Sequence, residues 1–185
     1  MPFNLPIFLT WLRIVLIPLM VAVYYVPEPW IHATGRDLAA TIIFVIAAVT
    51  DWLDGYLARK WNETSAFGAF LDPVADKLMV AAALIILVWL DRVGAILAIV
   101  IIGREITISA LREWMAESGK RSKVAVAYIG KVKTAAQFVA LSCLLYNQDL
   151  WGLPIRQIGF IALAIATLLT VVSMLQYLIS AFRNQ

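Results

Sequence analysis

Six long apolar runs restrict what this chain of 185 residues can fold into. A helix needs about 20 mostly apolar residues to cross a lipid bilayer, and each run is close to that length. In lipid, a single strand would leave its backbone groups without hydrogen bonds, so runs of this kind form helices. We therefore predict an all-α integral membrane protein with six transmembrane helices. The predicted spans are approximately residues 5–26, 37–58, 73–91, 93–115, 124–146 and 156–181.

The composition supports the same class of protein. Hydrophobic residues make up 63% of the chain and charged residues 15%, whereas soluble domains are about 45–50% apolar and about 25% charged. The six spans use most of the sequence, so we predict one membrane domain over residues 1–185 and no separate soluble domain. We do not interpret the net charge of +3 as a sign of nucleic-acid binding.

The distribution of basic residues between the loops predicts the orientation of the chain. One set of loops, together with the C-terminus, carries six basic residues, and the other set carries three. Because loops rich in Lys and Arg usually face the cytoplasm, we predict that both termini lie inside. The larger set is Arg59, Lys60, Lys120, Arg121, Lys123 and Arg183, and the smaller set is Arg36, Arg92 and Arg156.

Four aspartates lie at the predicted cytoplasmic edge of the second and third spans. Asp51 and Asp54 are three residues apart and Asp72 and Asp76 are four apart, so each pair shares one face of a helix. Since a short connection joins these antiparallel spans, we expect the pairs to meet at about the same depth. Carboxylates repel one another unless a cation lies between them, and Mg²⁺ or Mn²⁺ suits an all-oxygen set. A structural alternative also exists, with Asp72 as the N-cap of a helix that begins at Pro73.

Small residues between the two pairs leave room for a ligand. Gly55 and Ala58 keep one face of the second helix slim, and Gly68 is expected in the connection between the spans. Ordinary packing of small residues between membrane helices is the alternative. Arg59, at the end of the same helix, can fork onto phosphate oxygens or extend towards the membrane surface.

These residues form one pattern, which reads Asp51-x2-Asp54-Gly55-x2-Ala58-Arg59-x8-Gly68-x3-Asp72-x3-Asp76. At every fixed position the pattern resembles the signature of the CDP-alcohol phosphotransferase family. Three further segments are similar to members of that family that use sn-glycerol 3-phosphate as acceptor. They are NLPIFLTWLR (residues 4–13), GREITISALREWMAESGKRS (103–122) and YIGKVKT (128–134). The resemblance therefore covers nearly the whole chain.

The resemblance implies a reaction at the cytoplasmic face of a bacterial inner (cytoplasmic) membrane. CDP-diacylglycerol donates its phosphatidyl group to sn-glycerol 3-phosphate, CMP leaves, and the product is phosphatidylglycerophosphate, a precursor of phosphatidylglycerol and cardiolipin. Relatives in this family are homodimers, which implies a homodimer here as well.

The resemblance also implies roles for the residues of the pattern. Two ions of Mg²⁺ or Mn²⁺ are implied, with the ligands Asp51, Asp54, Asp72 and Asp76. Asp76 is further implied to be the general base that takes the proton of the acceptor hydroxyl. The residues implied to accommodate the CDP group are Gly55, Ala58, Arg59 and Gly68.

The phosphate of the acceptor needs cationic partners besides the metals. A charged group at the centre of a span costs about 2.5–3.5 kcal/mol, so cations within spans indicate a function. We predict that the phosphate is bound by Arg104, Arg112, Lys131, Arg13 and Thr10. The alternative is that the cations among them pair with Glu105, with Glu113 or with lipid headgroups.

Two other functions could use the same residues. The first keeps the chemistry and changes the acceptor, for example to inositol phosphate or serine. The second is a non-enzymatic carrier that binds divalent cations at the aspartates. A carrier needs a route across the membrane, and we expect no acidic residue in the outer halves of the spans to continue one. We therefore favour the enzyme.

Overall fold

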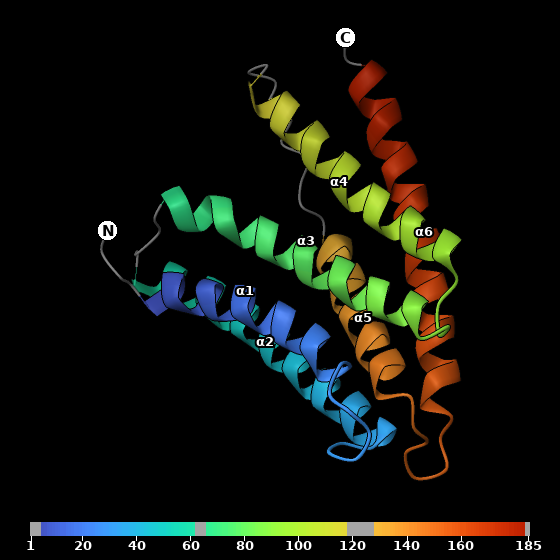
Figure 1. Ribbon diagram of the computed structural model, residues 1–185. Helices are drawn as coiled ribbons and strands as arrows, with labels where there is room; N and C mark the ends of the chain where they lie inside the picture. Colours follow the sequence, from blue (N-terminus) through green and yellow to red (C-terminus); the bar gives the residue numbers. More distant parts are fainter. Residues whose placement is uncertain (1–4, 62–65, 118–127, 184–185) are drawn as a thin grey trace.

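The computed structural model describes residues 5–61, 66–117 and 128–183, and it consists of helices joined by short connections (Figure 1). The six predicted helices are confirmed. They are α1 (Leu5–Val23), α2 (Ala33–Trp61), α3 (Ala66–Trp89), α4 (Ala95–Glu117), α5 (Tyr128–Tyr146) and α6 (Ile155–Arg183). Most of these residues are described with their side chains.

Two helices begin several residues earlier than predicted. α2 begins at Ala33 instead of residue 37, and α3 begins at Ala66 instead of residue 73. Asp72 therefore lies inside α3 and is not its N-cap, and Gly68 lies in the first turn of α3 and not in a loop. For α2 the prediction followed the apolar stretch, whereas the helix also includes the small and polar residues 33–36. For α3 the prediction began the span at Pro73, whereas the helix extends back to Ala66. Pro73 removes one backbone hydrogen bond, yet α3 runs through it.

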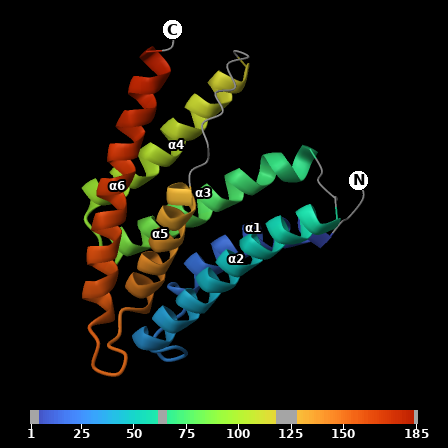
Figure 2. The ribbon, with the colours of Figure 1, turned by 180° about the vertical axis from the view of Figure 1, so that it is seen from behind.

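The helices pack so that α1 lies against both helices that carry the aspartates. α1 contacts α2 and α3, and α2 also contacts α5. α3 contacts α4 and α5, while α6 packs against α4 and α5. Figures 1 and 2 show the beginning of α1, the end of α2 and the beginning of α3 at the same end of the molecule. This arrangement brings both aspartate pairs towards α1.

An apolar core lies between the helices, and an apolar surface surrounds it. The largest fully buried apolar side chains are Phe44, Met20, Met79, Leu84, Leu87, Leu141, Leu144, Leu145 and Leu163. Equally apolar side chains lie on the outside: Ile96 is 81% exposed, Ile99 69% and Ile85 62%. In water such a surface is unfavourable and rare on a monomer, so it agrees with a protein that is surrounded by lipid.

Two helices in the described part of the chain are long and apolar enough to cross a membrane, judged by length and composition alone. They contain Ala33–Leu57 in α2 and Ile155–Met174 in α6. Shorter apolar helical stretches are Phe8–Val23 and Thr134–Tyr146. Charged residues interrupt the apolar sequence of α3 and α4, and these include the residues of the candidate site.

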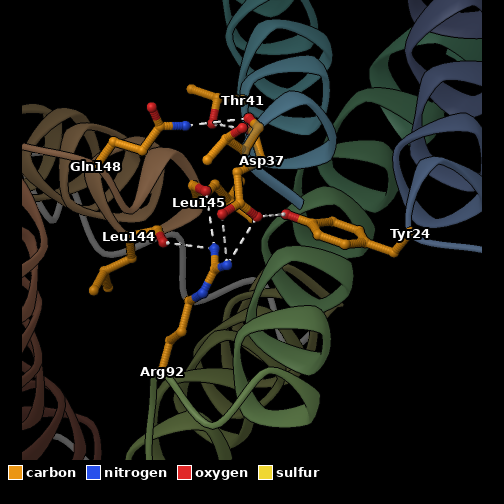
Figure 3. Close-up of polar contacts among 8 residues, drawn as sticks. Tyr24, Asp37, Thr41, Arg92, Leu144, Leu145 and Gln148 are labelled. Atoms are coloured by element: carbon orange, nitrogen blue, oxygen red, sulfur yellow. Dashed lines mark hydrogen bonds and ion pairs between the residues drawn. The ribbon is translucent and has the colours of Figure 1, made fainter. Parts of the chain in front are cut away.

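A buried polar cluster lies at the other end of α2 from Asp51 and Asp54 (Figure 3). The Nη2 atom of Arg92, in the α3–α4 connection, is 2.8 and 2.7 Å from the two carboxylate oxygens of Asp37. The Tyr24 hydroxyl donates a hydrogen bond of 3.2 Å to the same carboxylate. The Nη1 atom of Arg92 donates to the carbonyl oxygens of Leu144 and Leu145, at 3.3 and 3.0 Å. Arg92 thus caps the last turn of α5, where carbonyl groups lack helical partners.

Asp37 corrects one prediction. We expected no acidic residue in the span halves away from the aspartate pairs, but Asp37 lies near the start of α2, at the end opposite Asp51 and Asp54, and is only 5% exposed. Its carboxylate is paired with Arg92 and hydrogen-bonded to Tyr24, so its charge is neutralised in place. The cluster joins the end of α1, the start of α2, the α3–α4 connection and the end of α5, and we interpret it as structural.

Candidate active site

Arg13 lies at the centre of the candidate site. It belongs to α1, its side chain is fully buried, and its guanidinium group faces the first aspartate pair on α2. The Nη1 atom is 2.6 Å from Oδ1 of Asp51, and Nη2 donates a short hydrogen bond to Oδ2 of Asp54. Because the two aspartates are three residues apart on one helix face, a single planar guanidinium can bridge them.

Thr10 extends this contact to the second aspartate pair. It precedes Arg13 by three residues, about one helical turn, and is 1% exposed. Its hydroxyl donates a hydrogen bond of 2.7 Å to Oδ1 of Asp72 on α3. One face of α1 therefore supplies partners to three of the four aspartates, namely Asp51, Asp54 and Asp72.

Asp76 is the one of the four aspartates to which α1 gives no hydrogen bond or ion pair among the described residues. Its Oδ1 atom is buried and has no hydrogen-bond partner among the described residues. Its carboxylate is repelled by Asp51 and by Glu105 on α4, and it is attracted by Arg13 and Lys77. Repulsion also acts between Asp72 and both residues of the first pair. The four carboxylates thus lie close enough to interact, as their spacing predicts.

The aspartates fit a divalent cation in chemistry, although Arg13 holds two of them in the structure. All the donors are carboxylate oxygens, which Mg²⁺ and Mn²⁺ prefer, and the unpartnered Oδ1 of Asp76 offers one more ligand atom. Within the described residues, however, no three Asp, Glu, His or Cys side chains are grouped closely enough to hold a metal ion as they stand. In the structure Asp51 and Asp54 face the positive charge of Arg13.

The residues predicted to accommodate the CDP group are partly described. Gly55 follows Asp54 directly on α2, and Gly68 lies one turn before Asp72 on α3; both are half-buried. Ala58 and Arg59 belong to the last turns of α2, but their side chains lie outside the described part of the structure. The assignment of these four residues to the CDP group therefore stays a prediction.

The predicted acceptor-phosphate residues are described only in part. Arg104 forms an ion pair with the neighbouring Glu105, which is one of the alternatives predicted for it. Its Nε atom is buried without a hydrogen-bond partner in the described residues. Arg13 contacts the aspartates instead. The side chains of Arg112 and Lys131 are outside the described part of the chain, so their assignment is untested.

The sequence interpretation missed the pairing of α1 with the aspartates. Arg13 and Thr10 were predicted to bind the acceptor phosphate, with Glu105, Glu113 or lipid headgroups as the alternative partners of the arginine, and the aspartates were not among those partners. Four negative charges beside apolar sequence require a counter-charge, and Arg13 is an arginine within a predicted span. This requirement was the one available signal that Arg13 belongs with the aspartates.

The sequence is similar to known proteins over nearly its whole length. A family model described as CDP-alcohol phosphatidyltransferase matches residues 3–172. The chain is 50% identical over 187 aligned residues to proteins of Shigella flexneri serotype 5b (strain 8401), Shigella boydii serotype 4 (strain Sb227) and Escherichia coli (strain K12). Each alignment covers 98% of this chain and 96% of the relative. Each of these relatives is named CDP-diacylglycerol–glycerol-3-phosphate 3-phosphatidyltransferase.

Proposed function

Because this chain belongs to the CDP-alcohol phosphatidyltransferase family, we propose that it transfers the phosphatidyl group of CDP-diacylglycerol to sn-glycerol 3-phosphate. CMP is released and phosphatidylglycerophosphate is formed. The observation that carries this proposal is the 50% identity, over nearly the full length of both chains, to relatives named for this reaction. The convergence of four carboxylates from α2 and α3 supplies a site with suitable chemistry.

The proposed location is a bacterial cytoplasmic membrane, crossed by all six helices, with both termini and the active site on the cytoplasmic side. The donor has acyl chains in the lipid and a pyrophosphate at the surface, whereas the acceptor is a water-soluble dianion. A site at the ends of membrane helices lets the two substrates meet. The exposed apolar side chains of the bundle and the excess of basic residues in one set of loops support this placement.

The aspartates are proposed to hold two ions of Mg²⁺ or Mn²⁺ through Asp51, Asp54, Asp72 and Asp76. When bound, such ions neutralise and align the pyrophosphate of the donor. Gly55 and Gly68 present little side-chain bulk beside the aspartates, and together with Ala58 and Arg59 they are proposed to accommodate the CDP group.

Asp76 is proposed to be the general base. The hydroxyl oxygen of the acceptor attacks the β-phosphorus of the donor, the bond from this phosphorus to the oxygen of CMP breaks, and CMP leaves with the bonding electron pair. The proton of the hydroxyl passes to the carboxylate of Asp76. The buried Oδ1 of Asp76, which has no hydrogen-bond partner in the described structure, supports this role because a base needs a free lone pair within reach of the proton.

The acceptor phosphate is proposed to bind cations near the same end of the bundle. The assignment of Arg104 is supported by its ion pair with Glu105, whose charge interacts with that of Asp76. The other members of the proposed set are Arg112, Lys131, Arg13 and Thr10. We also propose that the protein is a homodimer, as the family resemblance implies.

An acceptor panel tests the proposal. Purified protein is given CDP-diacylglycerol and Mn²⁺ or Mg²⁺ with sn-glycerol 3-phosphate, inositol phosphate or serine, and the release of CMP is measured. We expect release with sn-glycerol 3-phosphate alone. Release with inositol phosphate or serine in its place would overturn the acceptor, and release that persists in a chelator would overturn the metal site.

A further inference from the structure

The fully buried Arg13 requires an explanation beyond acceptor binding. Burying a guanidinium group costs several kcal/mol unless its partners compensate for the lost water. In the structure the compensation comes from Asp51 and Asp54, which are also the first proposed metal ligands. The same two carboxylates therefore pair with one cation in the structure and are proposed to bind a different cation in the reaction.

A guanidinium and a divalent ion cannot use these oxygens in the same way at the same time. The contacts of Arg13 involve Oδ1 of Asp51 and Oδ2 of Asp54, one oxygen from each residue. A metal ion that binds both carboxylates would lie within a few ångströms of the guanidinium, and like charges at that distance repel strongly away from bulk water. A metal ion that takes these two oxygens therefore displaces the guanidinium from them.

The contacts of Arg13 also leave part of its hydrogen-bonding capacity unused. Its Nε and Nη1 atoms are buried without a hydrogen-bond partner among the described residues, although Nη1 is close to Asp51 in an ion pair. Unsatisfied buried donors are unfavourable, so the pairing is adequate in charge but incomplete in hydrogen bonding. A side chain held in this way can be drawn to another anion once its carboxylates are taken.

We propose that Arg13 is the internal counter-ion of the metal-free site and exchanges with the divalent cation. Without metal it holds Asp51 and Asp54 together and keeps α1 docked on α2. A bound metal ion would take these carboxylates as ligands. The guanidinium of Arg13 would then lose its ion pairs with them and be free to bind the acceptor phosphate. Arg13 is thus a positioning residue that couples metal loading to acceptor binding. The inference rests on the proposed metal-dependent function.

The exchange predicts that Arg13 competes with metal. Titration of purified protein with Mn²⁺, followed by the electron paramagnetic resonance signal of the free ion, measures the dissociation constant directly and needs no turnover. For Arg13→Gln we expect Mn²⁺ to bind on the order of tenfold more tightly than to the unchanged protein, which corresponds to about 1.4 kcal/mol. In chelator, the variant should also unfold at a lower temperature than the unchanged protein. Addition of Mn²⁺ should raise the unfolding temperature of the variant by more than it raises that of the unchanged protein.

Arg92→Gln is the matched control, because Arg92 is a half-buried arginine that also pairs with a buried aspartate, Asp37, at the opposite end of α2. It should lower the unfolding temperature in the same way, yet leave the affinity for Mn²⁺ within about twofold of the unchanged protein. Arg13→Lys is a second test that preserves the charge. A lysine ammonium is a point charge and cannot bridge two carboxylates as a planar fork does, so Mn²⁺ should bind with an intermediate constant.

The outcomes separate the two proposals. If the unchanged protein binds no Mn²⁺, both the metal site and the exchange are wrong. If the unchanged protein binds Mn²⁺ but Arg13→Gln and Arg13→Lys bind it equally or more weakly, the metal site stands and the exchange is overturned. Tighter binding in both Arg13 variants, with Arg92→Gln unaffected, supports the exchange, since a general loosening of the bundle would act on all three.

Discussion

Arg13 and Asp54 lie 41 residues apart in the sequence, yet they form a direct hydrogen bond in which both side chains are almost completely buried. This pair joins α1 to α2 at the end of the bundle where the second aspartate pair arrives on α3. The contact makes α1 part of the candidate site, and it gives the negative charges of the site a counter-charge that belongs to the protein itself.

Replacement of Asp54 by asparagine should destabilise the protein and remove its activity. Asp54→Asn removes the charge that compensates the buried Arg13, and breaking one half of a buried pair costs on the order of 3–5 kcal/mol. The measurement is the thermal unfolding temperature in a mild detergent containing chelator, followed by an assay of CMP release with Mn²⁺ at a temperature where the variant is folded. An unchanged unfolding temperature would contradict the buried pairing.

The same substitution at Asp76 should remove activity without destabilising the protein. Because Oδ1 of Asp76 has no hydrogen-bond partner in the described structure and its carboxylate is repelled by Asp51 and Glu105, Asp76→Asn should not lower the unfolding temperature. As the proposed general base, however, Asp76 should be needed for turnover, and the loss should be at least about 10²–10⁴-fold. Binding of the cytidine nucleotide should persist. Near-normal CMP release by Asp76→Asn would remove the residue from this role.

The cluster at the other end of α2 should matter for stability and not for chemistry. Asp37→Asn leaves Arg92 buried without its carboxylate and should cost on the order of 3–5 kcal/mol, whereas Tyr24→Phe removes one hydrogen bond and should cost about 1 kcal/mol. The check is thermal unfolding combined with the turnover of the folded fraction. Turnover per folded molecule that fell more than a few-fold in Tyr24→Phe would show that the cluster affects the reaction.

The contact between α5 and α6 provides a test of the packing. A Cβ atom added at Gly159 would lie 2.8 Å from Cβ of Cys143 and 3.1 Å from the carbonyl oxygen of Ala140. Gly159→Ala should therefore separate the two helices and cost about 1–3 kcal/mol. Gly103→Ala in α4 is the control, because nothing lies within 4 Å of its added Cβ and alanine favours a helix by about 1 kcal/mol over glycine. Equal unfolding temperatures for the two variants would contradict the α5–α6 packing.

The helices were predictable from the sequence because a long apolar run has few other structures available to it in lipid. The ends of the helices were not, since polar or small residues continue a helix past its apolar part, as in residues 33–36 of α2. The aspartate pairs were predictable because three- and four-residue spacings fix which side chains share a helix face.

The partners of the aspartates were not predictable from local spacing. Arg13 and Asp54 are 41 residues apart and Thr10 and Asp72 are 62 apart, so their contacts depend on how α1 docks against α2 and α3. For the same reason, the pairing of Asp37 with Arg92, which are 55 residues apart, could not be predicted from the sequence. Charge balance was the one guide, because a buried charge needs an opposite charge nearby, but it does not say which cation meets which aspartate.

The most direct test of the account measures both products of one reaction mixture. Purified protein is incubated with CDP-diacylglycerol and sn-glycerol 3-phosphate in chelator, and Mn²⁺ is then added in excess. We predict no product before the addition and, after it, CMP and phosphatidylglycerophosphate in equal amounts. Product in the presence of chelator, or CMP that forms without an equal amount of phosphatidylglycerophosphate, would contradict metal-dependent phosphatidyl transfer by this protein.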